Sequence, residues 1–223
     1  MPSLLEVCSG TGSMGRAFKA LGWEVTSLDF DPKSGADIIA DVCEWQPPEG
    51  AHWDAIWCSP PCTEFSIALT TRPRRLEEGL RVARRCLELI KQLKPTVWWI
   101  ENPGSGLLPK QEGFRELPCR MLTYCKYESP QHAYRKLTWV ATNCEAWQPR
   151  PRCMKSAPCQ FLHKGKHENC AQRGSMRLRS GALHGKACSL KQLYSMPPAL
   201  CHEIAQAATG VICGDKSPLA RPS

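Results

Sequence analysis

Short apolar runs alternate with helix-like stretches along most of this chain. Residues 76–93 carry apolar side chains at every third or fourth position, which predicts an amphipathic helix. The apolar runs on either side are short and bounded by turn residues, as buried strands are. Strands that alternate with helices are typical of a mostly parallel sheet with helices on both faces. The predicted strands are residues 4–8, 23–28, 37–40, 53–57, 96–100 and 136–141, and the other predicted helices are residues 13–21 and 198–209.

The pattern changes after Thr142. Residues 143–186 are rich in Cys, His, Pro, Gly, Lys and Arg, and they have little hydrophobic periodicity. A segment of this composition cannot bury enough apolar surface to fold alone, so we expect either an insert held by a metal ion or a mobile basic loop. Apolar residues return at 187–213. We therefore predict an α/β domain of residues 1–142 and 187–213, an insert at 143–186 and a disordered tail at 214–223.

Charge is concentrated in this insert. The chain has a formal net charge of +8, and the insert holds nine Lys or Arg residues against Glu145 and Glu168. An excess of this size favours an anionic partner such as nucleic acid. Arg72, Arg74 and Arg75 form a second basic group that could contact phosphates, or simply start a solvated helix.

No apolar run is long enough to cross a membrane, and the N-terminal residues do not resemble a secretion signal. We therefore expect an intracellular protein without a membrane partner, located in the nucleus of a eukaryotic host and otherwise in the cytoplasm or with the nucleoid. In such a reducing compartment, the 14 cysteines are not expected to form a disulfide framework. They are apolar filler, metal ligands or a catalytic thiol.

A glycine-rich loop joins the first predicted strand to the first helix. Gly10, Gly12 and Gly15 have the spacing G-x-G-x-x-G, and Asp29 ends the next strand. Such glycines let the backbone approach a ligand closely, and an acidic side chain at Asp29 could accept hydrogen bonds from two ribose hydroxyls. The pattern predicts a cofactor that contains adenosine, and it fits a nicotinamide dinucleotide as well as S-adenosylmethionine. Asp41, at the end of the third predicted strand, could accept a hydrogen bond from the adenine amino group.

Two reactive side chains follow neighbouring predicted strands. Pro60 and Pro61 stiffen the chain just before Cys62, and Glu101 ends the next strand. Both should therefore lie at the carboxyl edge of the sheet, where α/β enzymes place their chemistry. A thiolate that adds to carbon 6 of a cytosine makes carbon 5 nucleophilic, and a glutamate at ring nitrogen 3 stabilises the charge that develops. The base that removes the carbon 5 proton is not assigned.

These motifs resemble those of the DNA (cytosine-5) methyltransferase family. The family's Pro-Cys-x-x-Phe-Ser motif matches residues 61–66, its Glu-Asn motif matches residues 101–102, and its cofactor loop matches residues 6–12. The segment 194–200 is similar to the family's C-terminal Asn-Ala-Val-Pro-Pro-x-Leu, which returns to the cofactor pocket. The resemblance implies a Rossmann-like methyltransferase that uses S-adenosylmethionine and flips a cytosine out of duplex DNA.

The same resemblance implies roles for particular residues. Cys62 would attack the base, Glu101 would bind it, and Arg135, in a partial match to the family's Gln-x-Arg-x-Arg motif, would support both. Because Cys8 replaces the family's usual aromatic residue, adenine stacking falls to Phe30. The cofactor-binding set is Glu6, Cys8, Gly10, Gly12, Asp29, Phe30, Asp41 and Pro60. The family's target-recognition region is reduced to the insert, and we expect a monomer. Methylation of RNA or of a free nucleotide, an oxidoreductase, and a catalytically silent nucleic-acid-binding module are the alternatives.

Histidines and cysteines crowd into the insert. Sulfur and nitrogen ligands at short spacing suit tetrahedral zinc, and a metal ion would order a segment that packing alone cannot. The spacing contains no Cys-x-x-Cys, so the sequence fits a zinc-ordered knuckle and a mobile loop equally. The candidate ligands are Cys153, Cys159, His163, His167 and Cys170.

Overall fold

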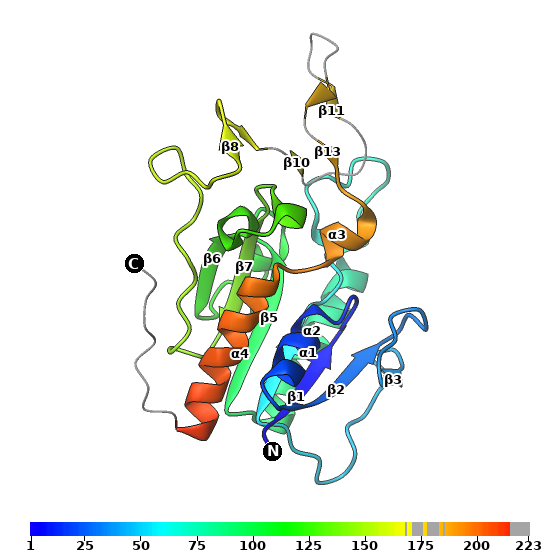
Figure 1. The fold of residues 1–223 in the computed structure, drawn as a ribbon. Helices are drawn as coiled ribbons and strands as arrows, with labels where there is room; N and C mark the ends of the chain where they lie inside the picture. The colour runs from blue at the N-terminus through cyan, green and yellow to red at the C-terminus, as the bar shows by residue number, and fades with distance from the viewer. Residues whose placement is uncertain (168, 171–175, 178–182, 185, 215–223) are drawn as a thin grey trace.

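The computed structural model contains one seven-stranded sheet in the order β3-β2-β1-β4-β5-β7-β6 (Figure 1). It describes residues 1–167, 169–170, 176–177, 183–184 and 186–214. The first five strands in this order are parallel, and β7 is antiparallel to both of its neighbours. The predicted α/β architecture is confirmed. The strands are β1 (Ser3–Val7), β2 (Glu24–Asp29), β3 (Ile38–Ile39), β4 (Ala55–Cys58), β5 (Val97–Pro103), β6 (Cys119–Thr123) and β7 (Leu137–Thr142).

Helices cover both faces of the sheet because successive strand residues point to opposite sides. Leu4 packs with α1 (Ser13–Ala20) and α4 (Pro198–Cys213) on one face, which is turned towards the viewer in Figure 1. Leu5 packs with α2 (Leu76–Leu93) on the other face. The apolar stripe at 76–93 therefore forms the buried face of an amphipathic helix, as its spacing predicts.

One strand of the main sheet, β6, and one α-helix, α3, were absent from the sequence prediction. Strand β6 mixes polar and apolar residues, and it forms because its partner β7 pairs with it along five residues. Helix α3 (Leu190–Tyr194) is too short to show a period, but it begins with a capping box, in which the Ser189 hydroxyl accepts from the Gln192 N–H and the Gln192 side chain accepts from the Ser189 N–H. Four short 3-10 helices complete the domain: η1 (Thr63–Phe65), η2 (Leu108–Lys110), η3 (Tyr124–Tyr127) and η4 (Pro130–His132).

The register of the parallel strands brings their ends to one edge. Val7 lies opposite Leu28 on one side and Cys58 on the other, and Cys58 lies opposite Ile100. The residues that follow these four positions are therefore neighbours, although they are up to about 90 positions apart in the sequence. This carboxyl edge carries the glycine loop, Asp29, the Cys62 loop and Glu101.

Part of the predicted insert belongs to the core. Cys144 and Trp147 are buried in the same cluster as Ile204 of α4, and the Arg150 guanidinium is 2.8 Å from the Glu203 carboxylate. The domain boundary at residue 142 therefore falls ahead of a segment that packs on the sheet. Most of the predicted tail, residues 215–223, lies outside the described residues, and Gly214 caps α4 with a left-handed φ of 69°.

The described residues of the insert after Arg150 form short strands beyond the carboxyl edge of the sheet (top of Figure 1). Strands β8 (Leu162–His163) and β9 (Lys166–His167) make a hairpin. Strand β10 (Asn169–Cys170) pairs with β13 (Lys186–Ala187), and β11 (Met176–Arg177) pairs with β12 (Leu183–His184). In the part of the chain that the structure describes, no helix has the length and apolar character of a membrane span.

The packing of Trp147 gives a test of this boundary. Trp147→Ala should lower the free energy of unfolding by about 3–5 kcal/mol, because it opens a cavity in the main core. Met154→Ala, which truncates an exposed side chain later in the same segment, should change it by less than about 0.5 kcal/mol. Urea unfolding measures both values. A loss below about 1 kcal/mol for Trp147→Ala would place this segment outside the core.

Candidate active site

The loop after β1 makes its turns with left-handed backbone. Gly10 and Gly12 have φ of 52° and 63°, and Cys8 has φ of 54°. Gly12 is the cap of α1, so the free N–H groups of that helix begin directly after it. Gly15 is needed for close packing, because a Cβ there would lie 2.5 Å from Glu6 Oε2. The glycine spacing thus serves both the turn and the approach of the helix to the strand.

The Glu6 side chain of β1 is bonded to the first turn of α1, directly after this loop. Its carboxylate is buried and accepts hydrogen bonds from the backbone N–H groups of Met14 and Gly15, and burial raises its pKa to about 7. Glu6 therefore fixes the start of α1, where a ligand of the loop would lie.

Asp29 ties the loop to β2. Its Oδ2 accepts from the Gly10 N–H at 2.8 Å and its Oδ1 from the Asp31 N–H at 2.9 Å. Each carboxylate oxygen has a second lone pair, so both can also accept from ribose hydroxyls. The neighbouring Phe30 is 70% exposed, which leaves its ring available for stacking. These residues fit an adenosine cofactor.

Asp41, which the sequence suggested as a partner of the adenine amino group, is paired with Arg81. Its carboxylate accepts from the Cys43 N–H and lies 2.9 Å from the Arg81 guanidinium of α2, which together lower its pKa. Any contact of Asp41 with adenine would compete with this ion pair.

The nucleophile loop is held in place by several contacts. The Asn102 side-chain amide donates to the Pro60 carbonyl at 3.0 Å, which joins the Glu-Asn motif to the loop of Cys62. Arg72 pairs with Glu64 of η1, and the Arg75 N–H donates to the same carboxylate at 2.7 Å. Arg72 therefore pins the loop that follows Cys62, and the pKa of Glu64 falls to about 2.

Cys62 lies half-buried at the start of η1. Burial raises the pKa of its thiol, the Lys136 ammonium lowers it, and the Glu101 carboxylate raises it. Cys62 is thus within electrostatic reach of both charges. Forming the thiolate here requires a partner that takes the proton or a nearby positive charge.

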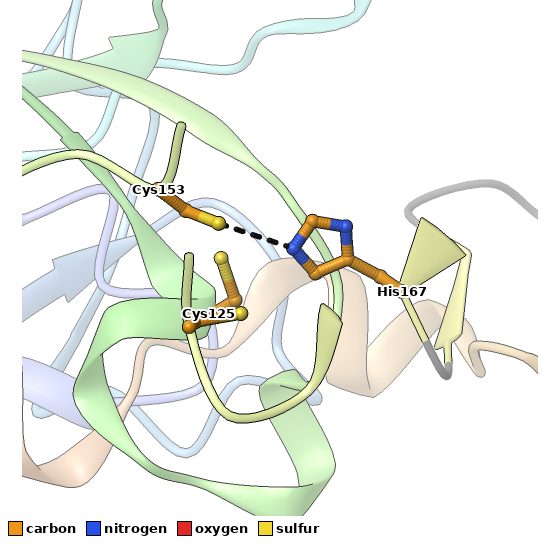
Figure 2. A group of neighbouring side chains, drawn as sticks. Cys125, Cys153 and His167 are labelled. Atoms are coloured by element: carbon orange, nitrogen blue, oxygen red, sulfur yellow. Dashed lines mark hydrogen bonds between the residues drawn. The ribbon is translucent and has the colours of Figure 1, made fainter. Parts of the chain in front are cut away.

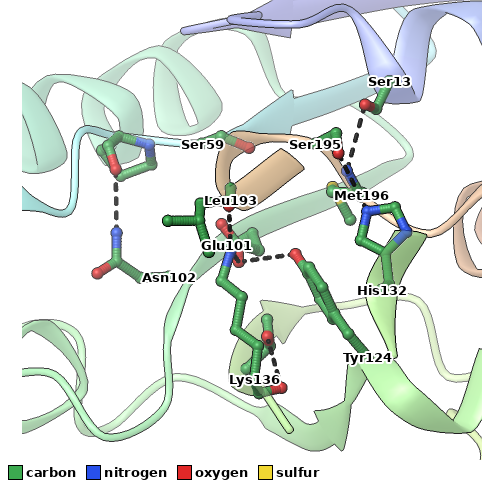
Figure 3. Close-up of polar contacts among 12 residues, drawn as sticks. Ser13, Ser59, Glu101, Asn102, Tyr124, His132, Lys136, Leu193, Ser195 and Met196 are labelled. Atoms are coloured by element: carbon green, nitrogen blue, oxygen red, sulfur yellow. Dashed lines mark hydrogen bonds and ion pairs between the residues drawn. The ribbon is translucent and has the colours of Figure 1, made fainter. Parts of the chain in front are cut away.

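Glu101 sits in a buried network of polar side chains (Figure 3). Its Oε1 accepts from the Tyr124 hydroxyl at 3.3 Å and lies 3.8 Å from Lys136 Nζ. Lys136 also donates to the Leu193 carbonyl at 3.3 Å and lies 4.6 Å from the centre of the Tyr124 ring. The contacts of the Glu101 carboxylate with Tyr124 and Lys136 are both made by Oε1, so Oε2 has capacity for a bound base.

Lys136 stands where the sequence placed Arg135. Arg135 is exposed, and its charge acts on His167 of the insert, whose pKa is lowered by burial and further by this charge. The chain turns at Arg135, where the Lys136 N–H donates to the Tyr134 carbonyl at 3.0 Å. Lys136, unlike Arg135, is half-buried beside Glu101. Sequence reasoning missed both Lys136 and Tyr124. The partial match to Gln-x-Arg-x-Arg indicated Arg135, and the next residue, Lys136, is the cation beside Glu101.

A second buried network joins the C-terminal motif to the cofactor loop. His132 contacts the Ser129 hydroxyl at 2.9 Å and the Ser195 hydroxyl at 3.0 Å, and burial lowers its pKa to about 4, so it is neutral. One residue on, the Met196 N–H donates to the Ser13 hydroxyl at 3.3 Å. The resemblance of residues 194–200 to a segment that returns to the cofactor pocket has this physical counterpart.

Three of the five predicted metal ligands come together with a residue from outside the insert. Cys153, Cys159 and His167 gather with Cys125, and the four ligand atoms lie within 4.8 Å of one another. His163 is exposed on β8 and is not part of this group. The side chain of Cys170, the fifth predicted ligand, lies outside the described residues. Cys125 was missed because it is 28 positions ahead of Cys153, in η3.

Comparison with known proteins places this site in a class. The chain is 28% identical over 217 residues to a probable DNA (cytosine-5)-methyltransferase of Frog virus 3, and the match covers 90% of this chain and 97% of that protein. No family model matches the chain.

Solved structures of other methyltransferases share the fold. The Entamoeba histolytica methyltransferase EhMeth has a TM-score of 0.56 at 10% identity, with 94% of this chain and 98% of that chain covered. A putative DNA modification methyltransferase encoded within an E. coli prophage has a TM-score of 0.52 at 14% identity, with 68% and 52% covered, so this chain spans about half of that protein. The fold is that of a methyltransferase. The predicted resemblance to the DNA (cytosine-5) methyltransferases is confirmed by the viral relative.

The buried Glu6 makes stability depend on pH. Because its folded pKa is about 7 against an ordinary 4.5, the folding contribution of the protonated group is complete below pH 4.5 and is lost as pH rises through 7. Glu6→Gln removes this loss. Relative to the wild type, the variant should gain about 3 kcal/mol in free energy of unfolding between pH 4.5 and 7.5.

Denaturant unfolding of both proteins at several pH values gives the difference. His132, whose lowered pKa acts in the opposite direction, is present in both proteins and cancels. Glu24→Gln, at an exposed position of β2, is the matched control. A difference between Glu6→Gln and wild type that stays constant over this pH range would contradict a buried, proton-binding Glu6.

Proposed function

We propose that this protein transfers a methyl group from S-adenosylmethionine to carbon 5 of cytosine in DNA. The observation that carries the proposal is the placement of Cys62 and Glu101 after neighbouring parallel strands, beside the glycine loop that follows β1. The viral relative supports DNA as the substrate. The basic strands of the insert, which lie at the same edge of the sheet, support a polyanionic partner (Figure 1).

Cys62 would act as the nucleophile. Its thiol loses a proton and the sulfur forms a bond with carbon 6 of the cytosine, which moves electron density to carbon 5 and ring nitrogen 3. Lys136 favours the thiolate because it stabilises negative charge at Cys62. S-adenosylmethionine supplies the methyl group that carbon 5 takes. Loss of the carbon 5 proton then lets the sulfur–carbon bond break and frees Cys62.

Glu101 would hold the base during this sequence. With Oε1 bonded to Tyr124 and Lys136, the carboxyl group is fixed and Oε2 can engage ring nitrogen 3, where charge develops. Asn102 keeps this strand at a constant distance from the nucleophile loop through the Pro60 carbonyl. A cytosine inside a duplex cannot reach the buried Glu101, so the target base must leave the stack.

The direct test is transfer of a tritiated methyl group from S-adenosylmethionine to duplex DNA, RNA and deoxycytidine nucleotide in parallel. We expect label on cytosine in DNA. Cys62→Ala should lower the rate at least about 10³-fold. Cys119→Ala, an exposed thiol at the start of β6, should leave it unchanged.

The outcomes separate the alternatives. Label in RNA or nucleotide alone would replace the DNA proposal with methylation of that substrate. Cofactor binding without transfer to any of them would favour a silent binding module. An adduct that resists denaturant, formed by wild type but not by Cys62→Ala on DNA containing 5-fluorocytosine, would show the covalent step, since fluorine at carbon 5 blocks release of the enzyme.

Lys136 gives a separate prediction. Lys136→Met should lower kcat about 10²-fold and move the thiol limb of the pH–rate profile to higher pH, because the cation that lowers the Cys62 pKa is gone. Lys136→Arg should recover most of the rate. Arg135→Met is the comparison, and its main effect should be weaker DNA binding. An equal or larger loss of kcat in Arg135→Met would return the role to Arg135.

A further inference from the structure

The insert and the catalytic domain meet at a small cluster of cysteines (Figure 2). Cys125 lies in η3 of the catalytic domain, Cys153 and Cys159 flank a tight turn, and His167 ends the β8–β9 hairpin. The three thiols are buried, and His167 is half-buried. We propose that these four side chains bind one zinc ion, and that this ion attaches the basic insert to the catalytic domain.

The distances suit a tetrahedral site. The four ligand atoms lie within 4.8 Å of one another, and Cys153 Sγ is 3.5 Å from His167 Nε2. Sulfur atoms around a tetrahedral zinc ion are about 3.8 Å apart, given zinc–sulfur bonds of about 2.3 Å. Side-chain shifts of about 1 Å therefore complete the site. Three sulfurs and one nitrogen form a common ligand set for structural zinc.

The backbone near the ligands is already fixed. The Cys153 N–H donates to the Thr123 hydroxyl at 2.8 Å, and the Lys126 ammonium donates to the Pro158 carbonyl at 3.0 Å. Between the two cysteines, Met154 and Ala157 exchange backbone hydrogen bonds of 3.2 and 3.1 Å. These contacts hold Cys153 and Cys159 next to Cys125 before any metal binds, which lowers the entropic cost of forming the site.

Buried apolar filler explains this cluster less well. The surrounding satellite core is small and contains Ala133 and Phe161 besides the three cysteines. His167 Nε2 is hydrogen-bonded to Cys153 Sγ at 3.5 Å, but that one bond does not account for two further thiols within 4.8 Å of the same nitrogen (Figure 2). A disulfide would use two of the sulfurs and leave the third thiol and His167 without a role.

The ion would position positive charge near the target base. The β8–β9 hairpin turns at Lys164 and Gly165, both with positive φ, which is the type I′ geometry of a two-residue hairpin. Lys164 and Lys166 are exposed on it. Cys125 directly follows Tyr124, which bonds Glu101. A zinc ion at this point would hold the lysines at a fixed distance from the catalytic carboxylate, within reach of backbone phosphates.

Metal analysis of the full chain, purified without added zinc, tests the site without reference to methylation. We expect about one zinc per chain. His167→Ala and Cys125→Ser should fall below about 0.2 equivalents. His163→Ala, on the opposite strand of the hairpin, and Cys144→Ser, a buried cysteine outside the cluster, should keep the metal.

Variants that restore or replace ligands guard against misfolding as the cause of metal loss. His167→Cys should bind zinc again, and cobalt in the wild type should give the intense visible absorption of a tetrahedral thiolate site, shifted in His167→Cys. Wild type with less than about 0.2 equivalents, or metal lost from His163→Ala and kept by His167→Ala, would overturn the assignment.

The positioning role has its own measurement. Wild type stripped by a chelator, and His167→Ala, should bind duplex DNA about tenfold more weakly with unchanged affinity for S-adenosylmethionine. DNA affinity that does not respond to zinc would reject the positioning role, even if zinc is bound. Zinc content does not depend on whether the protein methylates DNA. Absence of methyl transfer would therefore count against the proposed function and not against the zinc site.

Discussion

The alignment of β1, β4 and β5 is the constraint on which the rest of the structure depends. Hydrogen bonding between parallel strands places Val7, Cys58 and Ile100 side by side, so the cofactor loop, the thiol loop and Glu101 start from one line. A slip of one residue in either pairing would turn the buried side chains to the other face of the sheet. The alternation of Leu4 and Leu5 between two separate cores therefore protects the geometry of the site.

The antiparallel half of the sheet contributes the hydroxyl and the cation that contact Glu101. Tyr124 directly follows the end of β6 and Lys136 directly precedes the start of β7, so a hydroxyl and a cation from this pair of strands contact the Glu101 carboxylate. Lys136 links this group to Leu193 as well, and thus to the segment before α4. Cys125 follows Tyr124 in η3, so this short helix contacts both Glu101 and the cysteines of the insert.

Sequence alone predicted what depends on short-range chemistry. Period and turn residues located the helix at 76–93 and the loop around Gly10, and the Pro-Pro-Cys and Glu-Asn motifs indicated residues that the strand register brings together. Strand β6 escaped because its pairing with β7 sets its conformation. Lys136 and Cys125 escaped for a related reason: each belongs to its site through contacts with residues far away in the chain, which no local pattern records.

The bond between Met196 and Ser13 has a consequence for biosynthesis. The ribosome makes the cofactor loop well before Leu193, whose carbonyl accepts from Lys136, and before Met196, whose N–H donates to Ser13. Buried contacts of α1 with α4 follow the same order. A nascent chain that has just emerged through the insert therefore carries all of its reactive side chains and no assembled site. These contacts can form only after residues 193–196 have left the ribosome.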